Sequence, residues 1–211
     1  YNSYNKIVRA YNSILKQTLK NWEWVILDDS PDENHFNFLK EEFRDSRIRK
    51  YKRDKNSGNI GNVKNEAISL CRGKYILELD HDDEIVNYLL EESTNIFEDK
   101  EIGFIYWDFI NIYENKKNFF YSDFISLGYG GYYTQKLNNK WVNVYITPNI
   151  NNITTSYLVA MPNHPRIWRR DLLNKLENFS EYLPICDDYE ILLRTCINTK
   201  IVKVCEIGYI Q

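Results

Sequence analysis

Residues 75–83 read YILELDHDD, an apolar run that ends in three acidic residues within four positions. The run has the length and composition of a short buried strand, and Asp80, Asp82 and Asp83 follow at its carboxyl end. Hard divalent cations prefer carboxylate oxygens, and Mg²⁺ usually takes only one or two of them from a protein. Two interpretations of this turn are open: a cation site, or a solvated acidic turn that caps the next helix.

The sequence before this stretch alternates between helical and strand patterns. Apolar residues recur at helical spacing in residues 7–15, 36–43 and 63–70, and short apolar runs cover residues 22–27 and 48–52. Such alternation predicts an α/β domain with a mostly parallel central sheet flanked by helices. Ligands bind these sheets outside the carboxyl ends of the strands. We therefore expect Asp28 and Asp29, which end one strand, to lie at the same edge as the turn at residues 80–83.

The sequence after this stretch is less regular. We expect a strand at residues 103–112, helices at residues 171–176 and 187–196, and a last strand at residues 201–204. Residues 116–160 have many aromatic residues and asparagines but no clear period, so no element is assigned there. The 211 residues have the size of one compact domain, and we expect a single domain over residues 1–211.

Composition excludes several classes of function. A net charge of -3 and a pI near 5.7 provide no basic surface for a nucleic acid. The four cysteines are far apart in sequence and form no CxxC pair, which argues against a structural zinc site and favours a reducing compartment. No apolar run approaches the ~20 residues that span a bilayer. We therefore expect a cytoplasmic protein, which could still associate peripherally with a membrane.

A second acidic stretch, LPICDDYE at residues 183–190, leads into the predicted helix at residues 187–196. Asp187 or Asp188 could cap this helix or act in a site. The stretch MPNHPRIWRR at residues 161–170 is dense in polar and aromatic residues. His164 and Arg166 are candidate site residues there, although a lone histidine is often structural. Trp168 is expected to be a core or wall residue.

Several further segments fit one family in the right order. They are Tyr1-Asn2, residues 13–18 (SILKQT), residues 24–30 (WVILDDS), residues 56–58 (NSG) and Lys64-Asn65. Together with the two acidic stretches, they resemble the inverting glycosyltransferases of family 2, which have the Rossmann-like GT-A fold. In that family a first strand precedes the turn that Tyr1 resembles, so the resemblance implies that this strand is missing at the amino terminus. Lys64 stands where the family commonly has arginine, which keeps the charge without the bidentate fork.

The resemblance also implies a role for each matching residue. Tyr1 resembles the aromatic residue that packs on the nucleotide base, and Asn2 lies in the same turn. Asp29 resembles the acid that accepts a hydrogen bond from the NH group of the base. Asp28 and Asp29 could instead form a simple Asx-turn. Asp80 is similar to the acid near the ribose, and Asp82 to the residue that coordinates a Mn²⁺ or Mg²⁺ ion between the donor phosphates. The remaining implied roles fall on Lys64 and His164 for donor binding, Asp187 and Arg166 near the diphosphate or the acceptor, and Asp188 as the general base.

The function implied is metal-dependent transfer of a sugar, with inversion, from a nucleotide sugar to a hydroxyl group. The donor is expected to be a UDP-sugar, and the acceptor a glycan, a protein or a lipid-linked molecule. Two other classes stay open: a sugar nucleotidyltransferase, and a non-catalytic binding module with the same fold. Residues 119–133 are interpreted as an acceptor-side loop or as a plain structural insert. The sequence gives no indication of the oligomeric state.

Overall fold

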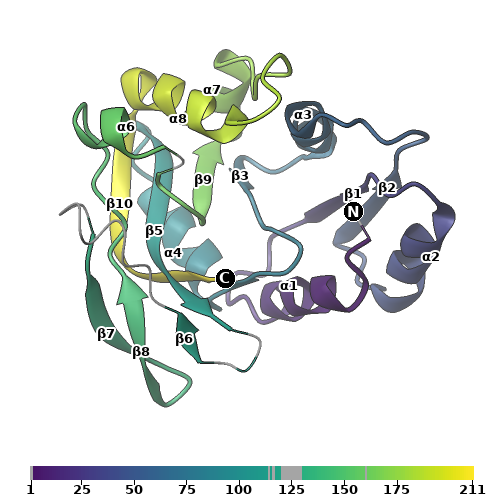
Figure 1. The fold of residues 1–211 in the computed structure, drawn as a ribbon. Coiled ribbons are helices and arrows are strands. Elements are labelled where there is room, and N and C mark those ends of the chain that lie inside the picture. Colours follow the sequence, from purple (N-terminus) through teal and green to yellow (C-terminus); the bar gives the residue numbers. More distant parts are fainter. Residues whose placement is uncertain (1, 114, 116, 120–129, 160) are drawn as a thin grey trace.

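The computed structural model describes residues 2–113, 115, 117–119, 130–159 and 161–211, and it has an α/β fold (Figure 1). The first half contains η1 (Tyr4–Lys6), α1 (Ile7–Leu15), β1 (Trp24–Asp28), α2 (Glu33–Glu42), β2 (Ile48–Lys52), α3 (Ile60–Leu70), β3 (Tyr75–Leu77), β4 (Glu84–Ile85), α4 (Leu89–Ile96) and β5 (Ile102–Ile112). The second half contains β6 (Asn118–Phe119), β7 (Tyr132–Leu137), β8 (Lys140–Tyr145), α6 (Thr154–Tyr157), β9 (Arg166–Arg169), α7 (Arg170–Lys175), α8 (Asp187–Asn198) and β10 (Lys200–Ile210).

The described strands form two sheets. β1 and β2 make a separate two-stranded parallel sheet, in which Trp24 lies opposite Ile48 and Asp28 lies opposite Lys52. The other sheet has eight strands, with the order β3–β9–β5–β10–β4 along its main path. In it, β6 and β8 also pair with β5, and β7 pairs with β8.

The α/β class is confirmed, but the prediction of a mostly parallel sheet is wrong. β1–β2 and β5–β10 are parallel, whereas β3–β9, β5–β9, β4–β10 and β7–β8 are antiparallel. The alternation of helix and strand on which the prediction rested ends at β5. After it, β7 and β8 are joined by a tight turn at Asn138 and Asn139, both with positive φ, and such a turn returns the chain antiparallel.

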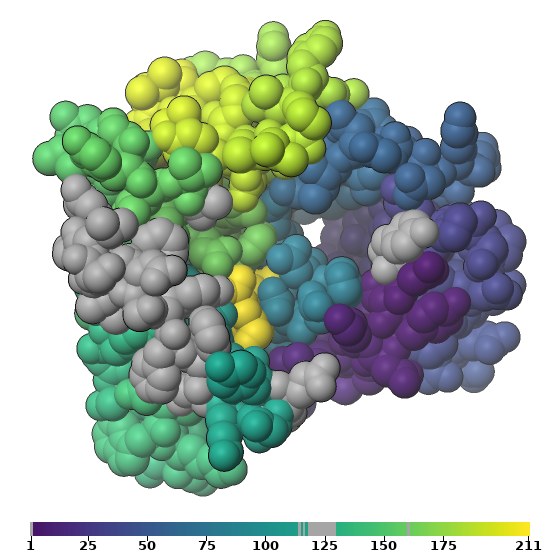
Figure 2. Space-filling view, viewed as in Figure 1, coloured from purple at the N-terminus to yellow at the C-terminus, as the bar shows by residue number. Residues whose placement is uncertain are grey.

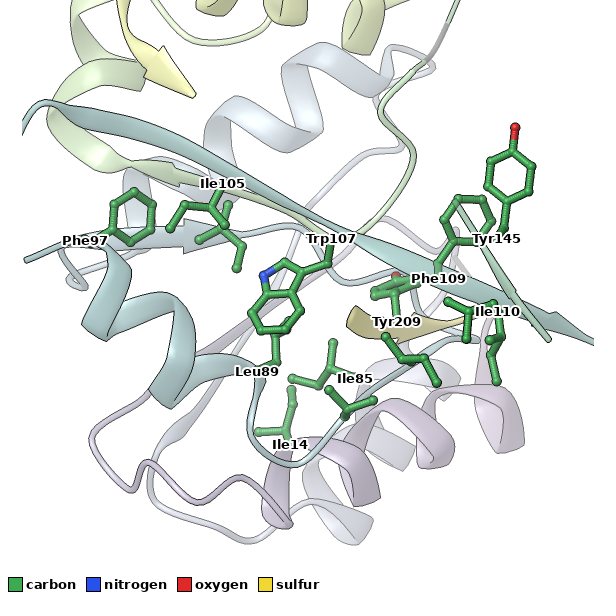
Figure 3. Close-up of a cluster of buried hydrophobic side chains, with 14 of the residues drawn as sticks. Ile14, Ile85, Leu89, Phe97, Ile105, Trp107, Phe109, Ile110, Tyr145 and Tyr209 are labelled. Atoms are coloured by element: carbon green, nitrogen blue, oxygen red, sulfur yellow. The ribbon is translucent and has the colours of Figure 1, made fainter. Parts of the chain in front are cut away.

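β5 lies at the centre of the core because both of its faces are buried. Ile105, Trp107 and Phe109 belong to one apolar cluster, which also includes Leu89 of α4 (Figure 3). Phe104 and Tyr106 belong to a second cluster on the other face, as expected for the alternation of side chains along a strand. Burial on both faces explains why residues 102–112 read as an almost continuous apolar run.

The second cluster fixes the position of α8 and therefore of the second acidic stretch. Trp168 of β9 is fully buried there, together with Ile191 and Leu192 of α8 and Ile68 of α3. Its indole nitrogen donates a hydrogen bond to Thr195 Oγ1 at 3.0 Å. The prediction that Trp168 is a core residue is confirmed. Each fully buried side chain of this size contributes roughly 1.5–3 kcal/mol to stability.

A groove of about 360 Å³ lies between the two sheets. It is lined by Trp24 and Val25 of β1, Ile68 of α3, and Ile76 and Leu77 of β3. Figure 2 shows an opening in this part of the surface, between the purple, blue and teal regions. The residues that follow β3, Glu78 and Asp80, also line the groove, so the acidic turn borders it.

The described helices include none that combines the length and the apolar character needed to cross a bilayer.

Gly61, in the first turn of α3, allows the helix to approach the loop before α8. A Cβ atom at Gly61 would clash with the backbone carbonyl of Ser180. Gly61→Ala should therefore lower the free energy of unfolding by about 1–2 kcal/mol, because the clash outweighs the gain in helix propensity. Urea unfolding of both proteins measures the difference. Gly131→Ala is the matched control, since a Cβ there meets only Ile146 at an ordinary 3.5 Å. Equal stability of the two variants would contradict this account.

Candidate active site

β1 ends in Asp28, whose buried carboxylate organises the loop that follows. Asp28 Oδ1 accepts hydrogen bonds from the Ser30 hydroxyl at 2.5 Å and from His35 Nδ1 at 2.8 Å. The other ring nitrogen of His35 accepts from the Ser3 amide at 3.2 Å, so the proton resides on Nδ1. Burial alone would raise the pKa of Asp28, but the bonds from Ser30 and His35 lower it. Since the Ser30 amide also bonds Asp28 Oδ1, Asp28 forms the Asx-turn.

Asp29 faces the loop that follows β2. Its carboxylate accepts from the side-chain amide of Asn56 at 2.7 Å and from the backbone amide of Ser57 at 3.0 Å. Arg53 Nε lies 3.2 Å from the same carboxylate. The loop at residues 56–58, which matches a segment of the family, is therefore held against Asp29 at the carboxyl ends of β1 and β2.

The turn at the amino terminus lies against the same region. The backbone amide of Asn2 donates to Ser30 Oγ at 2.9 Å, so Asn2 and Asp29 are neighbours across Ser30. Tyr1 lies outside the described residues, and its stacking on a base stays a prediction. The structure thus places Asn2, the predicted donor-binding residue that follows Tyr1, beside Ser30, which follows Asp29 in the chain.

The acidic turn after β3 carries more negative charge than its neighbours offset. The side chains of Asp80 and Asp82 are 55% and 41% exposed. Burial, together with the charges of Asp80 and Asp82, raises the pKa of Asp83 to about 7. Lys6 Nζ lies 3.6 Å from Asp82 Oδ2 and offsets part of this charge. The turn is a crowded set of carboxylates that is partly open to water.

The interpretation of this turn as a helix cap is wrong. The turn leads into the short strand β4, which pairs with β10, and α4 begins only at Leu89. Tyr88 precedes α4 and makes no side-chain cap hydrogen bond. The apolar residues Ile85 and Val86, which lie between the acidic turn and α4, pack into the core with Leu89 of α4.

The acidic turn fits a hard cation that takes few protein ligands. Across the described residues, no group of three His, Cys, Asp or Glu side chains forms a ready metal site. The exposed carboxylates of Asp80 and Asp82 and the raised pKa of Asp83 nevertheless indicate negative charge that a cation would offset. Mg²⁺ usually keeps waters and phosphate oxygens as most of its ligands. Asp82, the predicted metal ligand, is accessible for such a site.

The second acidic stretch lies at the start of α8. Asp187 is buried, with its Oδ2 3.1 Å from Lys64 Nζ. The side chain of Asp188 is 27% exposed, and its Oδ2 lies 3.1 Å from Arg166 Nη1. Cys186 occupies the N-cap position, so neither acid is the N-cap residue, although Asp188 Oδ1 accepts from the Tyr189 backbone amide at 2.8 Å in the first turn. Burial would raise the pKa of Asp188, but the positive charge of Arg166 lowers it, and Asp188 is ionised at neutral pH.

β9 carries Arg166 to a position between the two acidic stretches. Its side chain is 3% exposed, and Nη2 donates to His164 Nε2 at 3.0 Å. The other ring nitrogen of His164 lies 3.6 Å from Asp80 Oδ2. Burial and the charge of Arg166 lower the pKa of His164 to about 4, so the ring is neutral at pH 7. The contacts from Asp188 through Arg166 and His164 to Asp80 join two motifs that lie far apart in the sequence.

Lys64 completes this cluster through a residue that sequence reasoning missed, Glu78. Lys64 Nζ lies 3.1 Å from Asp187 Oδ2 and 3.1 Å from Glu78 Oε1. Burial would raise the pKa of Glu78, but the charges of Arg166 and Lys64 outweigh it and lower the pKa to about 2. The signal in the sequence was a single charged residue within the apolar run at residues 75–79.

Several proteins of known sequence are similar to this chain. The chain is 34% identical to the UDP-Glc:alpha-D-GlcNAc-diphosphoundecaprenol beta-1,3-glucosyltransferase WfgD of Escherichia coli over 116 residues, which are 54% of this chain and 45% of that protein. It is 28% identical to the chondroitin synthase of Escherichia coli over 197 residues, 92% of this chain and 25% of that protein. The chain spans less than half the length of these relatives.

Solved structures share the fold. The crystal structure of S. aureus TarS 1-349 matches with a TM-score of 0.73 at 20% sequence identity, over 100% of this chain and 57% of that one. The same TarS fragment in complex with UDP matches with a TM-score of 0.72 at 20% identity, over the same shares of the two chains. The model of the family described as glycosyl transferase family 2 matches residues 1–176. The chain belongs to glycosyl transferase family 2.

Proposed function

We propose that this chain transfers a sugar from a UDP-sugar to a hydroxyl acceptor, with inversion and with the help of a divalent cation. The observation that carries the proposal is the chain of contacts from Asp188 to Asp80, which runs through the buried side chains of Arg166 and His164. It holds a candidate base and a candidate donor-binding turn in one site. Membership of family 2 supports the transfer of a sugar as the reaction class.

A uridine donor is supported by the relatives. Structures of TarS in complex with UDP and with UDP-GlcNAc share the fold, and WfgD carries UDP-Glc in its name. In this chain, Asp29 and Asn2 would contact the base and Asp80 the ribose. Lys64 and His164 would lie near the diphosphate.

Asp188 would act as the general base. Its low pKa keeps it ionised, and its partly exposed side chain can meet an acceptor hydroxyl. The acceptor oxygen forms a bond to the anomeric carbon while the bond to the diphosphate breaks. The hydroxyl proton passes to Asp188, and the electron pair of the broken bond leaves with UDP. A single displacement of this kind inverts the anomeric centre.

Asp82 would hold the cation, with Asp80 beside it. The chemistry that Mg²⁺ or Mn²⁺ would supply there is stabilisation of the negative charge on the departing diphosphate. Lys6, 3.6 Å from Asp82, would be displaced from it or shared with the phosphates. Asp187 and Arg166 belong to the same cluster and would shape the floor of the site.

The acceptor would be a glycan, a protein or a lipid-linked molecule. A lipid-linked acceptor, such as the one in the name of WfgD, would place this protein at the cytoplasmic surface of a membrane. The predicted acceptor-side loop at residues 119–133 lies mostly outside the described residues, and its role stays a prediction.

Nucleotide binding is tested first by thermal unfolding with UDP, GDP, CDP or dTDP, each with and without Mn²⁺. UDP with Mn²⁺ should raise the melting temperature by about 5 °C or more at saturation, because a ligand of the folded state stabilises it by mass action. Asp82→Ala should remove this shift. Asp99→Ala is the matched control, since Asp99 is also an acid paired with a lysine, Lys200. A metal-independent shift, or one that survives in Asp82→Ala, would contradict the assigned cation site.

The base is tested by Asp188→Asn, which keeps the shape of the side chain and removes its basicity. Transfer from the UDP-sugar that binds should fall at least about 100-fold, the usual contribution of a general base. Circular dichroism and the UDP-induced thermal shift should be retained. Glu190→Gln on the same helix, which loses an ion pair with Arg194, should keep its activity. Turnover by Asp188→Asn near the wild-type rate would rule out this role.

A further inference from the structure

Glu78 is a charged residue in a place where the sequence is otherwise apolar. It follows β3 between Leu77 and Leu79, and its side chain is only 13% exposed. A buried carboxylate is costly unless charges or hydrogen bonds compensate it. The positively charged side chains of Arg166 and Lys64 compensate the charge of Glu78 and lower its pKa to about 2.

Lys64 and Arg166 each connect Glu78 to the second acidic stretch. Lys64 Nζ lies 3.1 Å from Glu78 Oε1 and 3.1 Å from Asp187. Arg166 Nε lies 2.8 Å from Glu78 Oε2, while its Nη1 donates to Asp188 at 3.1 Å. Lys64 therefore links Glu78 to Asp187, and Arg166 links Glu78 to Asp188.

The contact between Glu78 and Arg166 is an ion pair without the angle of a hydrogen bond. Glu78 Oε2 and Arg166 Nε are both buried and have no hydrogen-bond partner among the described residues. Charge attraction, rather than a directed bond, therefore draws the Nε side of the guanidinium toward Glu78. Arg166 Nη2 donates its hydrogen bond to His164, so only Nη1 donates to Asp188.

We propose that Glu78 is a positioning residue for the proposed base Asp188. Glu78 attracts the Nε side of the Arg166 guanidinium, so Arg166 makes only one hydrogen bond to Asp188, through Nη1. Without Glu78, the guanidinium turns toward Asp188 and binds both of its oxygens, the arrangement that arginine and carboxylate groups prefer. Asp188 then has less capacity to accept the acceptor proton. This inference rests on the proposed function, because it assigns Glu78 a task in the same reaction.

The kinetic test is Glu78→Gln, a substitution of nearly equal shape that removes the charge. The assay is UDP release from UDP-GlcNAc or UDP-glucose, with water as the acceptor when no other is known. The kcat value should fall about tenfold or more, and KM for the donor should change less than about twofold. Glu78→Asp, which restores the charge on a shorter side chain, should recover part of kcat.

Glu23→Gln is the matched control for a structural effect. Glu23 forms a similarly half-buried ion pair with Arg49 at 2.8 Å, away from Asp188. This variant should lose thermal stability without losing kcat. An equal loss of kcat in both variants, or an unchanged kcat in Glu78→Gln, would overturn the proposal. If Glu78→Gln does not fold, the same assay is made with Glu78→Asp. We then expect a reduced kcat and an unchanged KM for the donor.

A crystal structure separates this inference from the proposed function. In Glu78→Gln, the Arg166 guanidinium should move away from residue 78 and contact both oxygens of Asp188. This outcome does not depend on turnover, so it can be read even if wild-type protein hydrolyses neither UDP-sugar, a result that would count against the proposed function alone. An Arg166 side chain that stays in its wild-type position would overturn the positioning role.

Discussion

The guanidinium group of Arg166 lies almost entirely out of water between the carboxylates of Glu78 and Asp188. A buried arginine keeps its charge, so the surrounding chain must supply acids at fixed positions. Here the acids come from the end of β3 and the start of α8, while Arg166 itself begins β9. The antiparallel pairing of β9 with both β3 and β5 is what places Arg166 between them. The geometry of the candidate site therefore depends on this one compensated charge.

The apolar packing around the cluster keeps it in place. Two residues after Arg166, Trp168 is buried against Phe104 of β5, with the ring centroids 4.7 Å apart, and bonds Thr195 of α8. The charged end of β9 and the first turn of α8 are thus set by neighbouring apolar contacts on the same two elements. The charged groups themselves depend on one another, because removal of one partner leaves the other buried without compensation, so each variant in the cluster is compared with a folding control.

Sequence patterns identified the α/β class and the ends of the strands where acids collect, because both depend on local periods of apolar residues. They did not identify Glu78, whose partners Lys64 and Arg166 are neighbours only in the folded chain. The hairpin of β7 and β8 was also missed. The described residues of β7 alternate between half-buried and exposed, with none fully buried, so its apolar alternation is weak. The antiparallel course of β9 could not be predicted for the same reason, since the chain that leads to it has no clear period.

The two acidic stretches differ in how their charge is compensated. Asp187 and Asp188 face Lys64 and Arg166, and the pKa of Asp188 is low. Asp80, Asp82 and Asp83 crowd one another with less compensation, and the pKa of Asp83 is raised to about 7. Environments that separate the pKa values of nearby acids commonly separate their tasks. The proposed division rests on geometry as well: Asp188 is ionised and partly exposed, as a proton acceptor requires, and the carboxylates of Asp80 and Asp82 are exposed, as a cation with its diphosphate requires. His164 contacts both Arg166 and Asp80. Because its ring is neutral at pH 7, it connects the two acidic stretches without adding a positive charge to either.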